Sequence, residues 1–122
     1  MGLDELIATA DKMKRYSPPR HKLTVNRRLI GGDGVPSERV ELILGELSPG
    51  GEAERHSHTE SEQILYVLDG RCRVEALGQE RVLGPGTAVR FPEGLEHRIV
   101  VLDEKTLRCI VIYSPPIYSS TS

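Results

Sequence analysis

The sequence predicts an all-β protein whose strands form an antiparallel barrel of two sheets. After residue 20, short runs rich in Val, Ile and Leu recur at regular spacing, and Gly, Pro and Asp turns separate them. Residues 71–76 alternate charged with small or apolar side chains, which is typical of a strand with one buried face. The 122 residues suffice for one domain with one core.

The short N-terminal segment is expected to be helical or extended, and residues 3–15 are the helix candidate because Leu3, Leu6 and Ile7 begin an apolar stripe at helical spacing. The prolines at 18 and 19 end it. We predict a turn at Pro49-Gly50-Gly51 and strands over residues 22–30, 39–47, 54–58, 63–68, 71–77, 80–83, 87–91, 96–101 and 106–113. The chain therefore divides into an N-terminal segment (1–20), a barrel (21–114) and a flexible tail (115–122).

Composition excludes several classes of function. A net charge of −2 leaves no surplus of Lys and Arg to bind nucleic acid. No stretch approaches the roughly 20 apolar residues of a membrane-spanning helix, and the N-terminus lacks a secretory signal. Cys72 and Cys109 lie in apolar strand segments, so we expect buried, reduced thiols and a cytoplasmic protein.

Two of the four histidines, His56 and His58, are separated by a single residue. Side chains two apart on a strand point to the same face, so the two imidazoles would lie side by side. Such a pair suits a divalent transition metal such as Mn, Fe, Ni or Zn. Two solvated surface histidines would give the same pattern.

The wider context of these histidines resembles the cupin family. The first family motif is matched by Gly50, His56, His58, Gln63 and Gly70 at the family spacing, and the second by Gly86, Pro92, Gly94 and His97. The resemblance extends over residues 39–113. It implies a double-sheet cupin (jelly-roll) barrel with one divalent metal ion inside, held by His56 and His58 from the first motif and His97 from the second.

The sequence departs from the family at the position of the acidic ligand. The family spacing selects Gln63, whose neighbour Glu62 has the opposite parity, while Glu60 in the preceding loop is a third candidate. An amide ligand brings no charge. If Gln63 completes the site, the metal keeps its full 2+ charge, which favours an anionic small-molecule ligand.

Three other residues are interpreted from their positions. Arg90 would bind an anion if it pointed inward and is otherwise a solvated strand residue. Tyr66 has the opposite parity to Gln63, so we expect it to pack between the sheets. His21 lies outside both motifs and is predicted to be a surface residue.

We expect a metal-dependent enzyme that acts on a small anionic molecule. The resemblance implies dioxygenases, isomerases and lyases on the same barrel, and the fold does not select among them. The alternative is a non-catalytic module that binds a metal or a small molecule. The apolar stripe of residues 3–15 and the edge strand 22–30 need a surface to cover them, which favours a homodimer.

Overall fold

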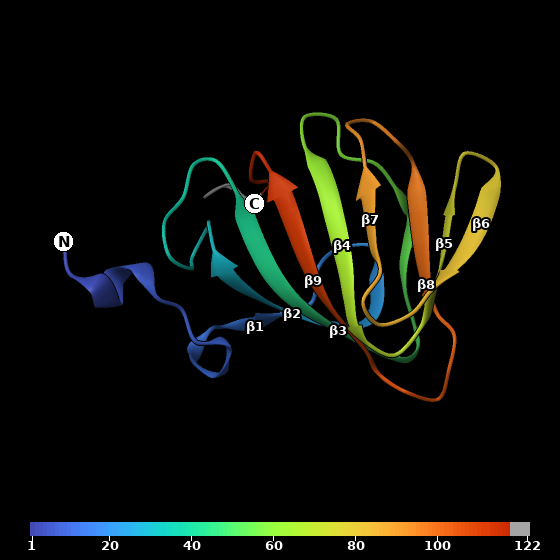
Figure 1. Cartoon of the computed structure of the whole chain (residues 1–122), viewed down its shortest axis with the longest axis horizontal. Coiled ribbons are helices and arrows are strands. Elements are labelled where there is room, and N and C mark those ends of the chain that lie inside the picture. Colours follow the sequence, from blue (N-terminus) through green and yellow to red (C-terminus); the bar gives the residue numbers. More distant parts are fainter. Residues whose placement is uncertain (118–122) are drawn as a thin grey trace.

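The computed structural model describes residues 1–117 and confirms the all-β prediction (Figure 1). The nearly closed antiparallel barrel contains almost no helix. Its strands are β1 (Arg15–Tyr16), β2 (His21–Ile30), β3 (Glu41–His56), β4 (Glu62–Asp69), β5 (Cys72–Ala76), β6 (Gln79–Leu83), β7 (Ala88–Phe91), β8 (His97–Val101) and β9 (Leu107–Ser114).

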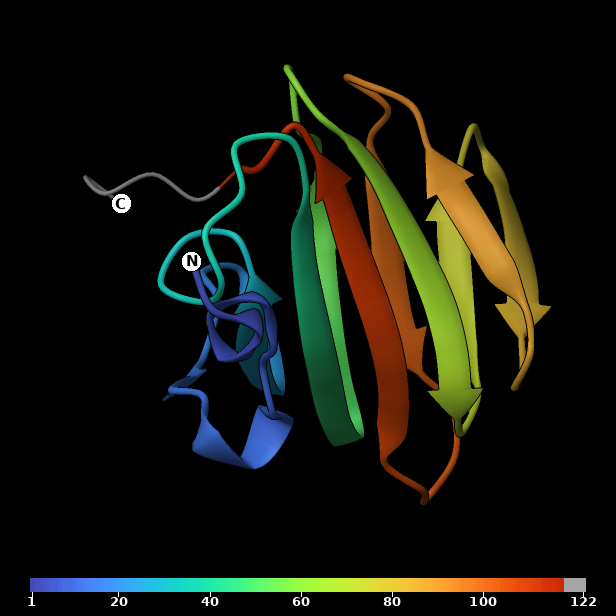
Figure 2. The same cartoon turned by 60° about the vertical axis from the view of Figure 1, so that its left-hand side comes forward.

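The long strand β3 connects the two sheets of the barrel. Its first half pairs with β9 and its second half pairs with β8, giving the strand order β6-β5-β8-β3-β9-β4-β7. Strand β2 pairs along most of β3 and carries β1 on its other edge. Figures 1 and 2 show β3 curving from one side of the barrel to the other.

The predicted turn at residues 49–51 is wrong, because β3 continues through it as a bend. Gly50 has a φ of +84°, which favours glycine, and a Cβ on Gly51 would lie 2.8 Å from the Ser48 carbonyl oxygen and 2.9 Å from that of Lys22. The ladder between β2 and β3 shifts register at the same level, between Lys22 and Thr24. This irregularity lets β3 pair with strands of both sheets.

The predicted helix over residues 3–15 is also wrong. The segment forms two short 3-10 helices, η1 (Leu3–Leu6) and η2 (Ala10–Lys12), neither of which contains a buried residue. Ala10 and Met13 are partly buried, but Leu3, Leu6 and Ile7 have little surface within the described chain to pack on, and isolated short helices are marginally stable. Within residues 1–117, no helix is long and apolar enough to cross a membrane.

The core lies between the two sheets and is mainly aliphatic, as its composition requires. Phe91, Leu65, Leu107 and Val67 are among its largest fully buried side chains. The two cysteines are buried and unpaired, as predicted. At the C-terminal end, the Ile117 amide donates a 2.9 Å hydrogen bond to Oε1 of Glu41, and residues 118–122 of the predicted flexible tail lie outside the described part.

Candidate metal centre

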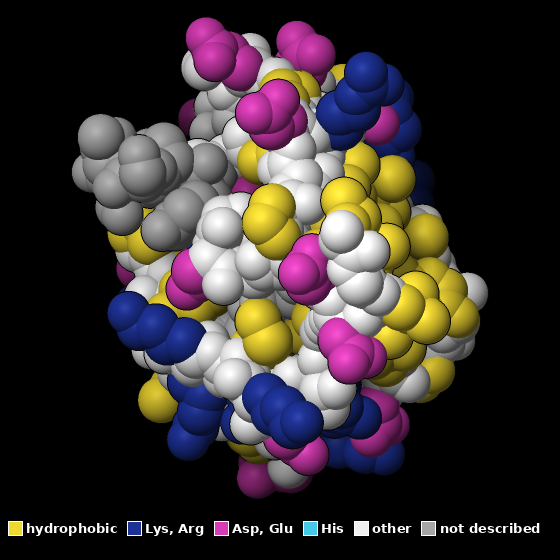
Figure 3. Space-filling view, turned by 90° about the vertical axis from the view of Figure 1, so that its left-hand side faces the viewer, with side chains coloured by type: hydrophobic (Ala, Val, Ile, Leu, Met, Phe, Trp, Pro, Cys, Tyr) yellow, Lys and Arg dark blue, Asp and Glu magenta, His cyan; other side chains and the backbone are white. Residues whose placement is uncertain are grey.

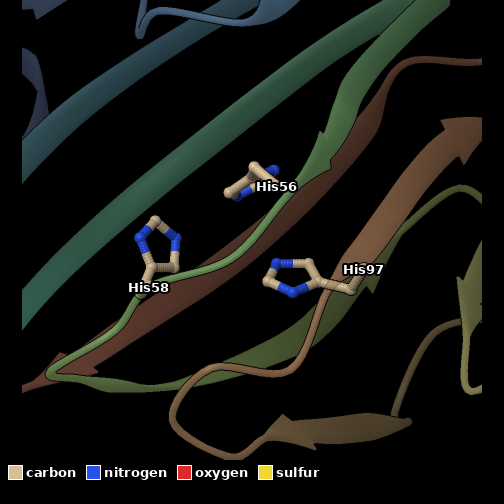
Figure 4. A group of neighbouring side chains, drawn as sticks. All are labelled: His56, His58 and His97. Carbon is tan, nitrogen blue, oxygen red and sulfur yellow. The ribbon is translucent and has the colours of Figure 1, made fainter.

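Three histidines from two distant parts of the chain lie together, with His56 and His58 on one segment and His97 on the other (Figure 4). His56 ends β3, His97 begins β8, and these two residues face each other in the ladder between the strands. The ring centroids of His56 and His97 are 4.5 Å apart, and those of His56 and His58 are 4.8 Å apart. Because β3 ends at His56, His58 belongs to the following loop rather than to the strand predicted over residues 54–58.

Backbone contacts hold His58 and His97 near each other. The Gly94 amide, in the turn before β8, donates a 2.8 Å hydrogen bond to the His58 carbonyl. Gly94 has a φ of +76°, a conformation that glycine adopts without strain. The ring of Phe91 stacks on that of His97 at a centroid distance of 3.9 Å and an angle of 4°. Phe91 before the turn and Gly94 within it, both in the second motif, thus fix the position of His97.

Backbone carbonyls fix which ring nitrogens carry hydrogen in two of the histidines. The Nδ1 atom of His56 lies 2.6 Å from the Glu54 carbonyl oxygen, and Nδ1 of His97 lies 3.0 Å from that of Leu95. A carbonyl only accepts hydrogen bonds, so each neutral imidazole carries its hydrogen on Nδ1. The lone pair is then on Nε2, the arrangement in which backbone carbonyls usually orient metal-binding histidines.

The second ring nitrogen of His97 faces an amide. Nε2 of His97 lies 3.0 Å from Oε1 of Gln63, and both residues are buried. With hydrogen on Nδ1, these two atoms are both acceptors, and moving the hydrogen to Nε2 would create the same conflict at the Leu95 carbonyl. A cation between Nε2 and Oε1 removes the conflict, as does a rotation of the amide that presents its NH₂ group.

The chemistry of the triad fits a metal ion. Nε2 of His58 is buried and has no hydrogen-bond partner among the residues that the structure describes, which is costly unless something binds it. One candidate nitrogen from each histidine lies within 4.8 Å of the others. Two nitrogens on one zinc ion lie at most about 4.2 Å apart, so the rings would close in slightly around an ion.

Burial keeps two of the three histidines, His58 and His97, neutral near pH 7. It lowers the pKa of His58 to about 4, assisted by His56 and His97, and it also lowers the pKa of His97 to about 4. Neutral imidazoles are the form that binds metal. Within residues 1–117, no carboxylate joins the group of three histidines.

The three candidates for the fourth metal ligand lie in different surroundings. Gln63 is buried beside His97, whereas Glu62 lies on the other face of β4. There it accepts a 3.1 Å hydrogen bond from Nη2 of Arg90, which is therefore a solvated strand residue rather than an inward-facing anion-binding group. Glu60 is exposed in the loop.

Two expectations about individual residues are wrong. Tyr66 is 40% exposed, because the face of β4 that packs between the sheets carries Gln63 and Leu65 instead. His21 is not a surface residue: it is half-buried, with its ring 6.1 Å from that of His56, and burial lowers its pKa to about 4. The pairing of His21 with Ala53 brings it there, and no local pattern signals this contact.

Sequence reasoning also missed Tyr113. This buried residue pairs with Gln63 across β4 and β9, and its ring packs edge-on against His58 at 4.9 Å. Burial and the nearby Glu41 raise the pKa of its phenol, so the hydroxyl stays protonated. The alternation of β9 places Tyr113 on the same face as Cys109, which was the available signal.

Three cavities lie in or near the triad, of which one, about 440 Å³, opens beside His58 between the loop 57–61 and residues 115–117. The barrel interior beneath His56 and Gln63 holds a cavity of only about 30 Å³, room for a water molecule or two. A cavity of about 450 Å³ lies outside it, between the segment 14–19 and strands β2, β3 and β9. His21, Asn26 and Tyr113 line both the interior and the outer cavity. The outer cavity has a volume typical of small-molecule sites.

Comparisons with known proteins identify the family. The family model described as "Cupin domain" matches residues 43–113. A curated relative, β-D-galactosidase Rv1717 of Mycobacterium tuberculosis, is 34% identical over 88 residues, which cover 72% of this chain and 75% of the relative.

Solved structures agree with this family match. The polyketide cyclase RemF from Streptomyces resistomycificus is 29% identical, with a TM-score of 0.75, over 92% of this chain and 84% of RemF. KdgF from Halomonas sp. is 24% identical, with a TM-score of 0.74, over 90% of this chain and 94% of KdgF, and it supports the fold alone. The chain belongs to the cupin family.

Proposed function

We propose that this cupin binds one divalent transition metal ion through His56, His58 and His97, with the amide oxygen of Gln63 as a fourth ligand. The observation that carries the proposal is the buried Nε2 of His58, which has no partner in the part of the chain that the structure describes. The Nδ1 contacts of His56 and His97 leave their Nε2 lone pairs available for the same ion. Mn, Fe, Ni and Zn all accept such ligands.

We further propose that the protein is a metal-dependent enzyme acting on a small anionic molecule. Three imidazoles and an amide are neutral, so a bound ion keeps its 2+ charge and attracts an anion such as a carboxylate or an enolate. A metal with open positions supplies Lewis-acid polarisation or an activated water. Dioxygenase, isomerase and lyase chemistry all remain within this proposal.

The relatives support an enzyme over a binding module. The names of Rv1717, a β-D-galactosidase, and of RemF, a polyketide cyclase, both describe catalysts. In this chain, the protonated phenol of Tyr113 beside His58 and the neutral imidazole of His21 supply polar groups next to the triad. Such groups can hold or transfer a proton near a bound ligand.

Elemental analysis of the purified protein, after dialysis against a metal mixture, tests the metal site. We expect about one ion per chain, because three preorganised nitrogens bind a divalent metal tightly. His97→Ala and His58→Ala should each lose most of this metal, and circular dichroism would establish that the variants remain folded. The matched control is His21→Ala, which removes a nearby half-buried histidine and should retain the ion.

Unchanged metal content in both triad variants would contradict the proposed site. Metal loss in His21→Ala alone would mean that the ligand set is wrong. A loaded protein that binds small carboxylates but shows no turnover across a range of them would favour the non-catalytic module instead.

The protein's partner is proposed to be a second copy of itself. The N-terminal segment leaves Leu3 and Leu6 largely exposed, 72% and 52%, on the described monomer. An isologous contact between two such segments would bury this apolar surface around a two-fold axis.

A further inference from the structure

His21 connects the triad to the larger cavity. It begins β2, outside both family motifs, and its ring lies 6.1 Å from that of His56. It lines both the 30 Å³ interior cavity and the 450 Å³ outer cavity. Because the barrel interior is nearly filled, a ligand that reaches from His56 into the outer cavity must extend past His21. A separate cavity of about 440 Å³ opens on the other side of the triad, beside His58.

A neighbouring threonine fixes the hydrogen-bonding character of His21. The Thr24 hydroxyl donates a 3.0 Å hydrogen bond to the Lys22 carbonyl, so its oxygen is left to accept. Nδ1 of His21 lies 3.3 Å from this oxygen and therefore carries the hydrogen. Nε2 of His21 bears the lone pair and has no protein partner within residues 1–117. It can accept a hydrogen bond from a donor group in either cavity.

The walls of the outer cavity are polar but balanced in charge. Nε of Arg28 donates a 2.6 Å hydrogen bond to Oε2 of the fully buried Glu41, and the guanidinium of Arg28 lies 4.4 Å from the centre of the Tyr16 ring. Nη1 of Arg28 also donates a 3.1 Å hydrogen bond to Oδ1 of Asp33, and Lys14 brings the lining to two cations and two carboxylates. This cavity favours neutral hydrogen-bonding groups over a second charge.

We propose that His21 is a specificity-determining residue, and that it accepts a hydrogen bond from a hydroxyl of a monoanionic, polyhydroxylated ligand. The ligand's anionic end lies at the triad and its hydroxylated remainder lies in the cavity between β2 and the segment 14–19. This inference rests on the proposed metal site. It also gives the N-terminal segment a role, because Tyr16 and residues 17–19 form one wall of the ligand cavity.

Calorimetric titration of the zinc-loaded protein with four defined carboxylates tests the inference. Acetate probes the metal alone, gluconate adds neutral hydroxyls, hexanoate has a similar length without hydroxyls, and glucarate adds a second charge. We expect gluconate to bind more tightly than hexanoate and glucarate, because only gluconate offers a donor to His21 without placing a second charge in the cavity.

Two substitutions assign the effect to His21. His21→Ala should weaken gluconate binding about fivefold to tenfold, the range for one neutral hydrogen bond, and leave acetate binding and zinc content unchanged. His21→Gln keeps an acceptor oxygen and should restore part of the affinity. Lys22→Ala is the matched control on the same strand, since Lys22 is exposed and pairs with Glu52 away from the cavity.

Each outcome is decisive. If zinc and acetate bind but gluconate has no advantage, or keeps its affinity in His21→Ala, the subsite is overturned while the metal site stands. If His21→Ala loses zinc, His21 is a ligand and the inference is wrong. If the wild-type protein binds no zinc, or binds zinc but not acetate, the proposed function fails and the subsite fails with it.

Discussion

Gln63 determines the charge of the proposed metal centre. Its amide oxygen lies 3.0 Å from Nε2 of His97 in a buried position, where a carboxylate would add a full negative charge. A charge so close to the ion, in a region of low dielectric, changes its affinity strongly. In the proposed centre, the amide would leave the ion electron-poor and available to an anion.

Gln63→Glu should therefore bind zinc about tenfold more tightly and acetate about tenfold more weakly than the wild-type protein, a change of about 1.4 kcal/mol in each case. Competition with a coloured chelator measures the first quantity, and calorimetry of the loaded protein measures the second. The matched control is Glu62→Gln on the outer face, which should change neither. Equal effects of the two substitutions would show that residue 63 does not coordinate the ion.

The buried histidines make the metal-free protein sensitive to acid. The pKa values of His21, His58 and His97 are lowered from about 6.5 to about 4, chiefly by burial. The unfolded chain therefore binds more protons than the folded chain between these pH values, so the free energy of unfolding falls as the pH falls. This contribution to stability is complete above about pH 6.5 and is lost toward pH 4.

Thermal unfolding of the chelator-treated protein should accordingly show a melting temperature that decreases steadily between pH 6.5 and pH 4.5. Histidine proton chemical shifts followed by NMR from neutral pH to below pH 4, as far as the protein stays folded, would measure the three pKa values directly. A melting temperature independent of pH, together with pKa values near 6.5, would contradict the burial of these imidazoles.

At the scale of residues, the sequence predicted the members of the site that belong to motifs and missed those that depend on strand pairing. The spacing of the two motifs pointed to His97, and the family register pointed to Gln63 over Glu62. His21 and Tyr113 reach the site only because β2 pairs with β3 and β9 pairs with β4. The alternation of β9 gives the face on which Tyr113 lies, but neither of these strand pairings leaves a trace in the local pattern of a single sequence.

At the scale of elements, most strands were predictable to within two residues, because Gly and Pro separate runs of β-branched residues. The failure at residues 49–51 has a physical cause. Pro-Gly-Gly normally marks a turn, yet here the glycines let β3 bend close to the Lys22 carbonyl and continue. This bend allows a single strand to pair with β9 and then with β8, and it delivers His56 opposite His97. A glycine pattern alone does not show whether a strand bends and continues or whether the chain reverses its direction.

The same limit applies to the N-terminal segment. The apolar stripe of residues 3–15 predicted a helix, but a short helix forms mainly where its apolar face packs on a surface. The described monomer offers little such surface, so only η1 and η2 form, and Leu3, Leu6 and Ile7 face outward. The apolar stripe therefore indicates that a partner covers this segment and does not indicate a local helix.

At the scale of the whole molecule, the exposed N-terminal face predicts self-association. Leu3, Leu6 and Ile7 are each more than half exposed, and a groove of about 940 Å³ separates this segment from the loop at residues 33–36. Figure 3, which views the molecule from this side, shows hydrophobic side chains gathered in a patch. Contiguous apolar patches of this kind usually mark an interface.

We expect a solution mass of twice the 13.5 kDa chain mass, measured by sedimentation equilibrium at micromolar concentration. Replacing Leu6 and Ile7 by Glu should yield a folded monomer, since two buried charges in each segment would oppose an isologous contact. The control is Leu77→Glu, at a residue 75% exposed in the turn between β5 and β6, which should leave the mass unchanged. A monomeric wild-type protein would refute the dimer. A dimer that survives the double substitution would place the interface elsewhere and leave the N-terminal segment with its role at the ligand cavity alone.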